Sequence, residues 1–464
     1  MNTTKAKHIH FVGIGGIGMS GIAEVLLNLG YKVSGSDVAP SETTKRLQQL
    51  GATIFVGHRG EQIQGADIVV YSSAVQPDNP ELKAAKSQNI PFIPRGEMLA
   101  ELMRMKVGIA VAGMHGKTTT TSMVSMVLAQ GGLDPTVVIG GKLNAIGTNA
   151  KLGQGKYLVA EADESDRSFL LLSPQIAVVT NLDPEHLDHY RDIEDIKSTF
   201  VQFLSRLPIT GKAILCIDDP KVCDLFPKVQ RPITTYGLRE DADFRATDIT
   251  FKGTTSTFTC QNHKKTLGTI SLPMPGIHNV TNALAAVAVG LEVGLNFSTI
   301  AKGLENFSGV QRRFTIKGEH KGIIVIDDYG HHPTEIQATI KAAKLAFPNR
   351  RIVVAFQPHR YTRTRDLFKE FVSAFEGADF IVLTDIYPAS EPPILEITTE
   401  KLYEAIVAKG QKNILYCGPR DKIPSTLWPE LKKNDIVLTM GAGDISKTGD
   451  ELLAFMRGRG ELNG

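Results

Sequence analysis

A short run of glycine, lysine and threonine residues constrains this chain more than any other part of its sequence. The residues Gly113-Met114-His115-Gly116-Lys117-Thr118-Thr119 follow an apolar, strand-like run and precede a predicted helix. In such a turn the backbone amides surround phosphate, the lysine reaches the β- and γ-phosphates, and the hydroxyl after it ligates Mg²⁺. The turn is shorter than the usual P-loop, because Val111 stands where that pattern has its first glycine. We predict a phosphate-binding loop, with a purely structural turn as the alternative.

The composition limits the kinds of protein that this chain can be. The 464 residues are 42% hydrophobic and 22% charged, which indicates a globular chain of roughly three domains. The net charge of +2 argues against a general nucleic-acid-binding surface. There is no signal-peptide pattern and no run of about 18 apolar residues. The cysteines form no paired motif and are typical of a reducing compartment: Cys216, Cys223, Cys260 and Cys417. We predict a cytoplasmic protein without nucleic-acid partners or membrane insertion.

Strands and helices alternate along the chain in three segments. The first, residues 1–105, opens with the strand-like run HIHFVGIG, a glycine turn and a helix expected from about Met19 to Leu29. The second, residues 106–312, begins again with a strand, a glycine turn and a helix, which indicates a domain boundary. The third, residues 313–464, alternates in the same way. We predict an α/β fold with parallel sheets and ligand crevices at the carboxyl ends of the strands.

The glycine turn of the first segment is Gly13-Ile14-Gly15-Gly16-Ile17-Gly18. Asp37 follows at the end of the next strand, as it does in dinucleotide-binding proteins. The physical requirement is broader, because a helix N-terminus approached by glycines suits any diphosphate. NAD or FAD, a UDP-type ligand and a structural turn therefore all remain open from this motif alone.

Acidic residues follow two later strands of the second segment. Glu161 ends the run KYLVAE, and the stretch TNLDPEHLDHY supplies Asp183, Glu185, His186 and Asp188. Because Mg²⁺ prefers oxygen ligands, carboxylates at strand ends near a triphosphate are candidate metal ligands. The alternatives are a helix cap or a solvated charge for each acid and a polar turn residue for His186.

The stretch PGIHNVTN opens a predicted helix from about Asn279 to Leu291. Asn279 and Asn282 are expected one turn apart on one face, with His278 beside Asn282. An amide side chain can both donate to and accept from an adenine edge, so this helix start is a candidate nucleotide contact. Capping of the helix by Asn279 is the alternative.

Charged clusters follow the strands of the third segment. They comprise Arg312 and Arg313 at its start, the run DDYGHHP over 327–333 and the run HRYTR over 359–363. Arginine suits phosphate and carboxylate because its planar group forms two parallel hydrogen bonds. These clusters are candidates for binding an anionic substrate, and solvated surface arginines are the alternative.

Together these motifs resemble the Mur ligase family in content and order. The matching runs cover almost the entire chain: GMHGKTTT, EADESD, the His186 loop, PGIHNVTNALAA, GVQRRF, DDYGHHPTE and FQPHRYTRT. The opening run GIGGIGMSGIAEVL is similar to the alanine-adding members in particular. The resemblance implies a Rossmann-like domain over 1–105 that binds UDP-N-acetylmuramate and a P-loop ATPase-like sheet domain over 106–312. It also implies a Rossmann-like domain over 313–464 that helps to bind L-alanine and closes the site. The shortened loop is the normal form in that family, and the first glycine turn would hold a UDP-sugar.

The resemblance also implies roles for individual residues. ATP would contact Gly113, Met114, His115, Gly116, Lys117, Thr118, Thr119, His278, Asn279, Asn282, Arg313 and Asp328. The UDP-sugar would contact Gly13, Gly15, Gly16, Gly18, Met19, Asp37 and Ser72. Mg²⁺ would be held by Thr118, Glu161 and His186, and the muramate and amino-acid ends would meet Tyr329, Arg360 and Arg363. The residues expected to take part in catalysis are Lys117, His186, Asp328 and His331.

The implied reaction is ATP-dependent ligation of L-alanine to the lactyl carboxylate of UDP-N-acetylmuramate through an acyl phosphate, in peptidoglycan precursor synthesis. A monomer or a homodimer would carry it out. Several family members carry a carbamoylated lysine, but Lys197 lacks the spacing for that role, so a second metal would be held differently. The alternatives are a ligase that reattaches a recycled peptide, an oxidoreductase that uses the first glycine turn, a metal-dependent hydrolase and a non-catalytic nucleotide-binding module. The hydrolase would be built on His186, Asp188 and His189.

Overall fold

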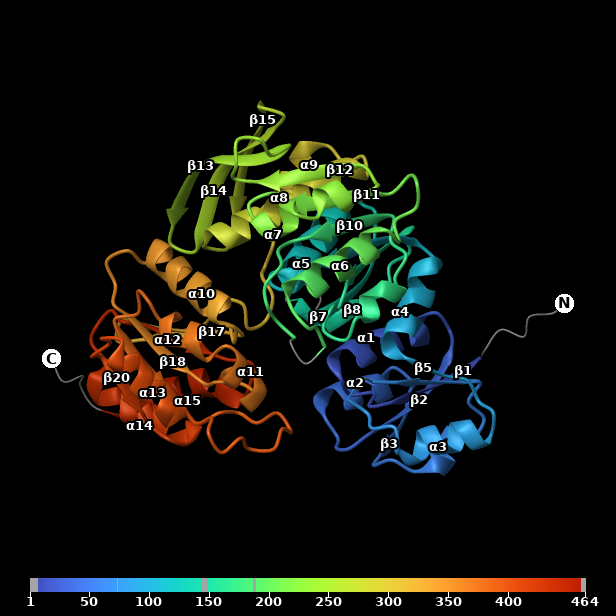
Figure 1. Ribbon diagram of the computed structural model, residues 1–464, viewed down its shortest axis with the longest axis horizontal. Helices are drawn as coiled ribbons and strands as arrows, with labels where there is room; N and C mark the ends of the chain where they lie inside the picture. Colours follow the sequence, from blue (N-terminus) through green and yellow to red (C-terminus); the bar gives the residue numbers. More distant parts are fainter. Residues whose placement is uncertain (1–6, 73, 144–147, 187–188, 460–464) are drawn as a thin grey trace. The chain divides into compact units, whose positions relative to one another are not determined.

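The computed structural model describes residues 7–72, 74–143, 148–186 and 189–459. Asp188, one of the candidate metal ligands, lies outside the described residues. The described chain forms three sheets, which Figure 1 shows in blue, in green to yellow, and in orange to red. None of the helices in these described ranges is long and apolar enough to cross a membrane.

The chain divides into two compact units. One unit contains residues 1–248, 258–271 and 281–308, and the other contains residues 249–257, 272–280 and 309–464. The first two sheets lie mainly in the first unit and the third sheet in the second unit.

The first sheet has five parallel strands in the order β3-β2-β1-β4-β5. Its strands are β1 (His8–Val12), β2 (Lys32–Asp37), β3 (Thr53–Val56), β4 (Ile68–Tyr71) and β5 (Phe92–Pro94). Its helices are α1 (Ile17–Asn28), α2 (Glu42–Gln49), α3 (Pro80–Ser87) and α4 (Arg95–Arg104). The strand order changes direction between β1 and β4, and a ligand crevice in such a sheet lies at the carboxyl ends of these strands. The predicted Rossmann-like arrangement is confirmed.

The second sheet has ten strands in the order β15-β14-β13-β12-β11-β10-β6-β9-β7-β8. Its strands are β6 (Val107–Ala112), β7 (Thr136–Leu143), β8 (Thr148–Lys151), β9 (Tyr157–Glu161), β10 (Ile176–Val179), β11 (Lys212–Cys216), β12 (Ile233–Gly237), β13 (Phe244–Lys252), β14 (Thr255–Asn262) and β15 (Lys265–Leu272). Its helices are α5 (Lys117–Gln130), α6 (Ile193–Leu204), α7 (Pro220–Cys223), α8 (Ile277–Glu292) and α9 (Phe297–Glu305). The strand β6 is central and pairs in parallel with β9 and β10, so the ends of three strands meet beside the loop that follows β6.

One hydrophobic core runs through the first two sheets. It includes Phe11 of β1, Met98 of α4, Ala110 of β6 and Phe200 of α6, all of which are buried. Because the same core supports both sheets, the turn after β1 and the loop after β6 belong to one packed body.

The third sheet has six strands in the order β16-β17-β21-β18-β19-β20. Its strands are β16 (Thr315–His320), β17 (Ile323–Asp328), β18 (Ile352–Phe356), β19 (Phe380–Leu383), β20 (Ile414–Tyr416) and β21 (Ile436–Met440). Its helices are α10 (Pro333–Ala346), α11 (Tyr361–Asp366), α12 (Phe368–Ser373), α13 (Thr399–Ala408), α14 (Ile423–Leu427) and α15 (Thr448–Arg457). Alternate residues of the strands enter two separate cores, with Val354 in one and Val353 in the other, so both faces of the sheet are covered.

The expected α/β class is confirmed, with two local differences. The strand β8 runs antiparallel to β7, and β16 runs antiparallel to β17, which the alternation of strands and helices did not indicate. In both pairs a short link joins consecutive strands, which suits a hairpin rather than a crossover helix. The first helix begins at Ile17 rather than at Met19, because the glycine turn already ends at Gly16.

Candidate active site

The end of β2 holds the glycine turn between β1 and α1. The carbonyl of Ser36 accepts hydrogen bonds from the amides of Gly13 and Ile14, both at 2.9 Å. The carboxylate of Asp37 accepts a third from the amide of Gly15 at 2.8 Å. A Cβ atom at position 15 would lie 2.8 Å from that carboxylate and would displace it. Asp37 therefore orders the turn itself.

The other residues predicted for the UDP-sugar lie around the same turn. Gly16 is the N-cap residue of α1, and Gly13 has a positive φ of 81° and lies beside Ser72. A Cβ atom at Gly18 would lie 2.9 Å from the guanidinium of Arg95. Met19 is buried in the core, where it packs rather than lining a surface. An anion at the N-terminus of α1 would meet backbone amides and the positive end of the helix dipole.

The loop between β6 and α5 has two glycines at which any side chain would be strained. Gly113 has a φ of 131°, and a Cβ atom there would lie 2.1 Å from the hydroxyl of Thr180. Gly116, the N-cap residue of α5, has a φ of 81°, and a Cβ atom there would lie 2.8 Å from the amide oxygen of Asn282. The short loop thus packs directly against β10 and α8.

The segment after β10 anchors this loop. The amide of His115 donates to the side-chain oxygen of Asn181 at 2.9 Å, and the carbonyl of His115 accepts from Asn181 and from the hydroxyl of Thr180. Met114 donates its amide to the carbonyl of Asn181 and has a buried side chain. The loop conformation is therefore set by a neighbouring strand as well as by its glycines.

Lys117 lies at the first position of α5, and its ammonium points back over the loop. It donates to the carbonyls of Gly113 at 2.6 Å and Met114 at 3.0 Å and to the carboxylate of Glu164 at 2.8 Å. Burial disfavours the charged lysine, but the carboxylates of Glu164, Glu161 and Glu185 outweigh this and raise the pKa of Lys117. The lysine is a fixed cation at the loop.

Glu161 ends β9 beside the loop, as predicted. Its carboxylate accepts from the hydroxyl of Thr118 at 3.0 Å and from the amide of Gly140 at 2.7 Å. Burial raises the pKa of Glu161, and the charge of Lys117 opposes that rise. The hydroxyl of Thr118 and the carboxylate of Glu161 are the oxygen donors that a divalent cation prefers.

Glu164 and His186 complete this cluster. The His186 ring nitrogen lies 3.6 Å from the carboxylate of Glu164, which is only 1% exposed. Burial lowers the pKa of His186, but Glu164 and Glu185 outweigh it, so the net shift is upward. The backbone of His186 has a positive φ of 56°, an unfavourable conformation for a side chain with a Cβ atom. The carboxylates of Glu161, Glu164 and Glu185 thus lie around one lysine and one histidine.

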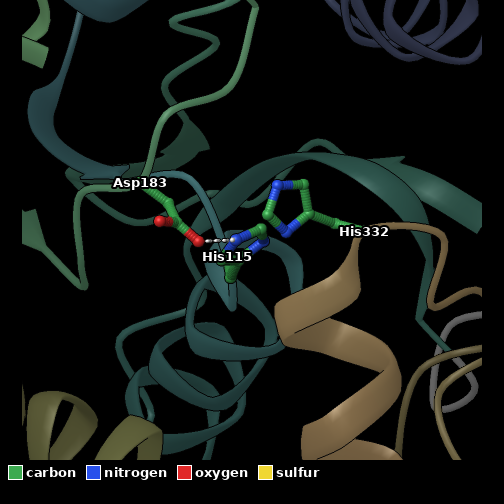
Figure 2. A group of neighbouring side chains, drawn as sticks. All are labelled: His115, Asp183 and His332. Atoms are coloured by element: carbon green, nitrogen blue, oxygen red, sulfur yellow. Dashed lines mark hydrogen bonds and ion pairs between the residues drawn. The ribbon is translucent and has the colours of Figure 1, made fainter. Parts of the chain in front are cut away.

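Three pairs of basic and acidic side chains border the loop. His115 meets Asp183 at 3.2 Å (Figure 2), and the ammonium of Lys221 lies 3.5 Å from the same carboxylate. The guanidinium of Arg95 donates to Asp163 at 2.8 Å. Because Arg95 also covers Gly18, it connects the turn at α1 with the segment that follows β9.

The start of α8 carries the three polar residues that were predicted to contact the nucleotide. Asn279 donates its side-chain amide to the carbonyl of Pro275 at 2.7 Å, a contact in which the side chain donates rather than accepting from a backbone amide as a helix cap does. Gly276 has a φ of 100°, and a Cβ atom there would lie 2.7 Å from the His278 ring. Asn282 is buried against Gly116 of the loop. Asn282 is therefore the α8 residue beside the predicted phosphate site.

In the second unit, Asp328 lies at the end of β17. Its carboxylate accepts from the amides of Phe314 and Gly330, both at 2.8 Å, and from the hydroxyl of Thr339 at 3.2 Å. Burial raises the pKa of Asp328, and the nearby Arg313 opposes the rise. Arg313 itself pairs with Glu335 at 3.3 Å. Asp328 thus orders the junction at residues 312–314.

Aromatic and arginine side chains gather at the ends of β17 and β18. The guanidinium groups of Arg312 and Arg313 lie 4.9 and 5.4 Å from the ring centre of Tyr329. The Tyr329 ring meets His331 at 5.2 Å, and His331 meets His359 at 6.1 Å. The cluster combines arginine and aromatic side chains, and each arginine also has a carboxylate partner, Asp327 for Arg312 and Glu335 for Arg313.

The two arginines after β18 have separate partners. Arg360 donates to Glu391 at 2.6 Å, and Arg363 donates to the ring of His359 at 3.1 Å. The His359 ring stacks on Tyr387 at 5.5 Å. Arg360 has a positive φ of 71°, so its backbone is held in an unfavourable conformation at the start of α11.

Sequence patterns had not singled out several residues of this arrangement. Glu164 and Asp163 stood within the run EADESD, and Thr180 and Asn181 opened the stretch after β10, so position after a buried strand was an available signal. Glu335 stood at the end of the run DDYGHHPTE, whereas Glu391, which accepts from Arg360 and Thr362, follows no strand-end motif.

Family models match nearly all of the chain. The model described as Mur ligase family, catalytic domain, matches residues 8–107. The Mur ligase middle domain matches residues 111–290, and the glutamate ligase domain of Mur ligases matches residues 312–443.

Individual relatives match over their full length. The UDP-N-acetylmuramate--L-alanine ligase of Geotalea daltonii is 59% identical over 98% of this chain and 99% of its own. That of Desulfatibacillum aliphaticivorans is 54% identical over 97% of this chain and 99% of its own.

Solved structures have the same fold. A UDP-N-acetylmuramate-alanine ligase from Thermotoga maritima has a TM-score of 0.82 at 30% identity and covers 97% of this chain and 99% of its own. A murein peptide ligase from Psychrobacter arcticus has a TM-score of 0.72 at 26% identity and covers 98% of this chain and all of its own.

Proposed function

The chain belongs to the Mur ligase family, and on that basis we propose that it joins L-alanine to the lactyl carboxylate of UDP-N-acetylmuramate with ATP, in peptidoglycan precursor synthesis. The relatives that share more than half of its residues carry the name of this activity.

One structural observation supports the proposed reaction in addition to family membership. Two glycine turns suited to anions, at Gly13–Gly18 and at Gly113–Gly116, lie on one packed body and share a core. Arg95 connects them, since it covers Gly18 and pairs with Asp163. A ligase that phosphorylates a sugar-borne acid needs a diphosphate site and a triphosphate site at a fixed separation.

The loop after β6 supports ATP as the triphosphate. The loop leads into the N-terminus of α5, and Lys117 is a charged donor held on the loop carbonyls. We assign the γ-phosphate to Lys117 and place Asn282 beside the loop. His278, Asn279, Arg313 and Asp328 remain proposed contacts of the nucleotide.

The donor set also fits Mg²⁺. Thr118 and Glu161 offer hard oxygen ligands, and His186 offers a ring nitrogen beside the buried carboxylate of Glu164. The net negative charge of Glu161, Glu164 and Glu185 around Lys117 would be balanced by a divalent cation. When bound, the ion would neutralise charge on the transferring phosphoryl group.

The chemistry then follows from the reactivity of a carboxylate. Its oxygen is a poor leaving group, so transfer of the γ-phosphoryl group to it gives an acyl phosphate and ADP. The neutral amine of alanine attacks the acyl carbon, and phosphate departs from the tetrahedral intermediate. Lys117 would stabilise the negative charge that develops on the transferring group and on this intermediate.

We assign binding of the amino acid and closure of the site to residues 313–464. Tyr329, His331, Arg360 and Arg363 gather at the ends of β17 and β18, where arginine and aromatic side chains suit a carboxylate. Residues 1–105 would bind the UDP-sugar and residues 106–312 the ATP.

One assay tests the proposal directly. Purified protein is given ATP, Mg²⁺ and UDP-N-acetylmuramate, and ADP release is measured with L-alanine, glycine, L-serine or D-glutamate. L-Alanine should give the highest kcat/KM. Absence of ADP release with every amine, or amide formation without ATP, would contradict it.

A second activity has a specific observation in its favour. The murein peptide ligase of Psychrobacter arcticus has a similar fold over the whole chain, so a peptide acceptor deserves the same assay. Offering a tripeptide in place of alanine separates the two activities. Titration with NADH should give no saturable binding, since the first turn is assigned to a UDP-sugar.

We also propose that the enzyme works in the cytoplasm, where its nucleotide substrates are made, as a monomer or a homodimer. Light scattering of the purified protein would determine its mass in solution.

A further inference from the structure

A chain of buried polar side chains lies beneath the glycine turn of the first sheet. It consists of His8 and His10 on β1, Ser34 and Ser36 on β2, and Glu81 in the first turn of α3. His10, Ser36 and Glu81 are each 0% exposed. Such a group of titratable side chains is costly to bury unless every member is hydrogen-bonded.

The contacts form one continuous path. The His8 ring lies 2.8 Å from the carbonyl of Gly65 and, through its other nitrogen, 2.8 Å from the hydroxyl of Ser34. The His10 ring lies 2.8 Å from the same hydroxyl and 2.9 Å from Oε2 of Glu81.

A count of protons along this path fixes its charge. The path has a carbonyl at one end and the carboxyl group of Glu81 at the other, and the carbonyl and an ionised carboxylate can only accept. The four contacts between them need four protons, whereas Ser34 and two neutral imidazoles supply three. At least one proton must therefore be added to the path.

The added proton belongs on His10. Burial lowers the pKa of His8, so His8 resists a second proton. His10 faces Glu81 directly, and a doubly protonated ring there forms a buried ion pair with the carboxylate. Burial opposes ionisation of Glu81, but its hydrogen bonds from His10, Ser36 and His58 outweigh this and lower the pKa of Glu81.

The other end of the network reaches the glycine turn. The hydroxyl of Ser36 donates to Oε2 of Glu81 at 2.8 Å, and the His58 ring lies 3.0 Å from the same hydroxyl. The carbonyl of Ser36 is the group that accepts from the amides of Gly13 and Ile14. A single residue thus joins the buried carboxylate to the turn.

From these contacts we infer that Glu81, held by a doubly protonated His10, is a positioning residue for the UDP-sugar, and that it acts through Ser36 on the turn Gly13–Gly18. This inference rests on the proposed function, since it needs the turn to bind a UDP-sugar. It adds buried residues of the first domain to the substrate site. These residues are separated from the turn by up to 68 positions in the sequence.

The test compares two serines of the same strand. Ser36→Ala removes the hydroxyl that joins Glu81 to the turn, whereas Ser34→Ala removes an equally buried hydroxyl that joins two histidines. Binding of UDP-N-acetylmuramate and of ATP to the full chain is measured by calorimetry. Ser36→Ala should weaken UDP-N-acetylmuramate binding about fivefold and Glu81→Gln about tenfold, with ATP binding unchanged. Ser34→Ala, which can act on Glu81 only through His10, should weaken UDP-N-acetylmuramate binding less than Ser36→Ala does and leave ATP binding unchanged.

Three outcomes overturn the inference. The first is unchanged UDP-N-acetylmuramate binding in Ser36→Ala, which decides the matter even if Glu81→Gln fails to fold. The second is an equal loss in Ser34→Ala, because that would indicate general loosening of the domain. The third is a nitrogen NMR spectrum of histidine-labelled protein in which His10 carries a single N–H proton. If the wild-type protein binds no UDP-N-acetylmuramate at all, the proposed function fails instead, and the two failures are distinguishable.

Discussion

The ammonium of Lys117 lies 2.8 Å from Oε1 of Glu164, a carboxylate that is only 1% exposed. The remaining contacts of the lysine are to the carbonyls of Gly113 and Met114, so its three N–H bonds all have acceptors within the loop region. This geometry holds the cation on the loop and makes its charge and its position depend on Glu164.

Replacing Lys117 should abolish most of the activity. Lys117→Ala is expected to reduce kcat by at least about 100-fold, because it removes a charged donor from the transferring phosphoryl group. UDP-N-acetylmuramate binding should remain normal, since the turn Gly13–Gly18 has no contact with this side chain in the described structure. ADP release and calorimetry measure the two effects, and near-normal turnover would contradict the assignment.

Removing only the charge of Glu164 should also slow the reaction. Burial disfavours the charged lysine, and Glu164 is foremost among the carboxylates that offset this. Glu164→Gln is expected to lower kcat about tenfold or more, the usual effect of losing a hydrogen bond to a charged group. Glu194→Gln serves as the control, because Glu194 pairs with Lys197 away from the loop and is 66% exposed. Equal kcat values for Glu164→Gln and the wild type would argue against this role.

Lys197 should be an ordinary ion-pairing lysine. Hydrogen bonds to Asp224 and Glu194 raise the pKa of Lys197, and both carboxylates lie 2.7 Å from its ammonium. Carbamoylation requires a neutral amine, which these two partners disfavour. Lys197→Ala should keep its kcat within about twofold of the wild type, and added bicarbonate should have no effect. A large loss that bicarbonate and a short carboxylic acid restore would indicate a carbamate instead.

Local sequence patterns predicted the site residues that lie at or just after the carboxyl ends of strands. The glycine turns, Lys117, Thr118 and Glu161 follow buried strands, and a strand's carboxyl end has a fixed place in a parallel sheet. The order of the strands and the closing of two hairpins depend on pairing between distant segments, which periodicity does not encode. The alternation of strands and helices therefore indicated the α/β class but not the antiparallel pairing of β8 and β16.

The sequence alone did not predict contacts between residues that are far apart in the chain. His10 and Glu81 are 71 positions apart, and nothing in either local run indicates a buried ion pair. Glu164 lies three positions after Glu161, yet its role depends on the turn that follows β9 and on the backbone conformation of His186. Whether each predicted residue contacts a substrate stays a prediction, which the variants described above and below test.

A side chain at position 116 should weaken ATP binding. Gly116→Ala forces a residue with a Cβ atom into a φ of 81°, which costs about 1 kcal/mol or more, and brings that atom within 2.8 Å of the Asn282 amide oxygen. We expect KM for ATP to rise about tenfold with little change in KM for UDP-N-acetylmuramate. The double variant with Asn282→Ala should recover part of the loss by removing the close contact. If the second substitution only worsens ATP binding, Asn282 has a direct role with the nucleotide.

His359 should make the second unit sensitive to acid. Burial, followed by the charges of Arg363, His331 and Arg360, lowers the pKa of His359 from 6.5 to about 3. The guanidinium of Arg363 can only donate, so the His359 nitrogen that it meets at 3.1 Å must be unprotonated. Between these two pKa values the unfolded chain binds a proton that the folded chain does not, so stability falls as the pH drops from 6.5 toward 3.

His359→Asn tests this directly, because the asparagine oxygen can accept from Arg363 but does not titrate. Between about pH 7.5 and pH 5, the melting temperature of the wild type should fall further than that of the variant. His263→Asn is the matched control, since His263 is 74% exposed, and it should retain the pH dependence of the wild type. Parallel curves for His359→Asn and the wild type would mean that another group controls the acid sensitivity.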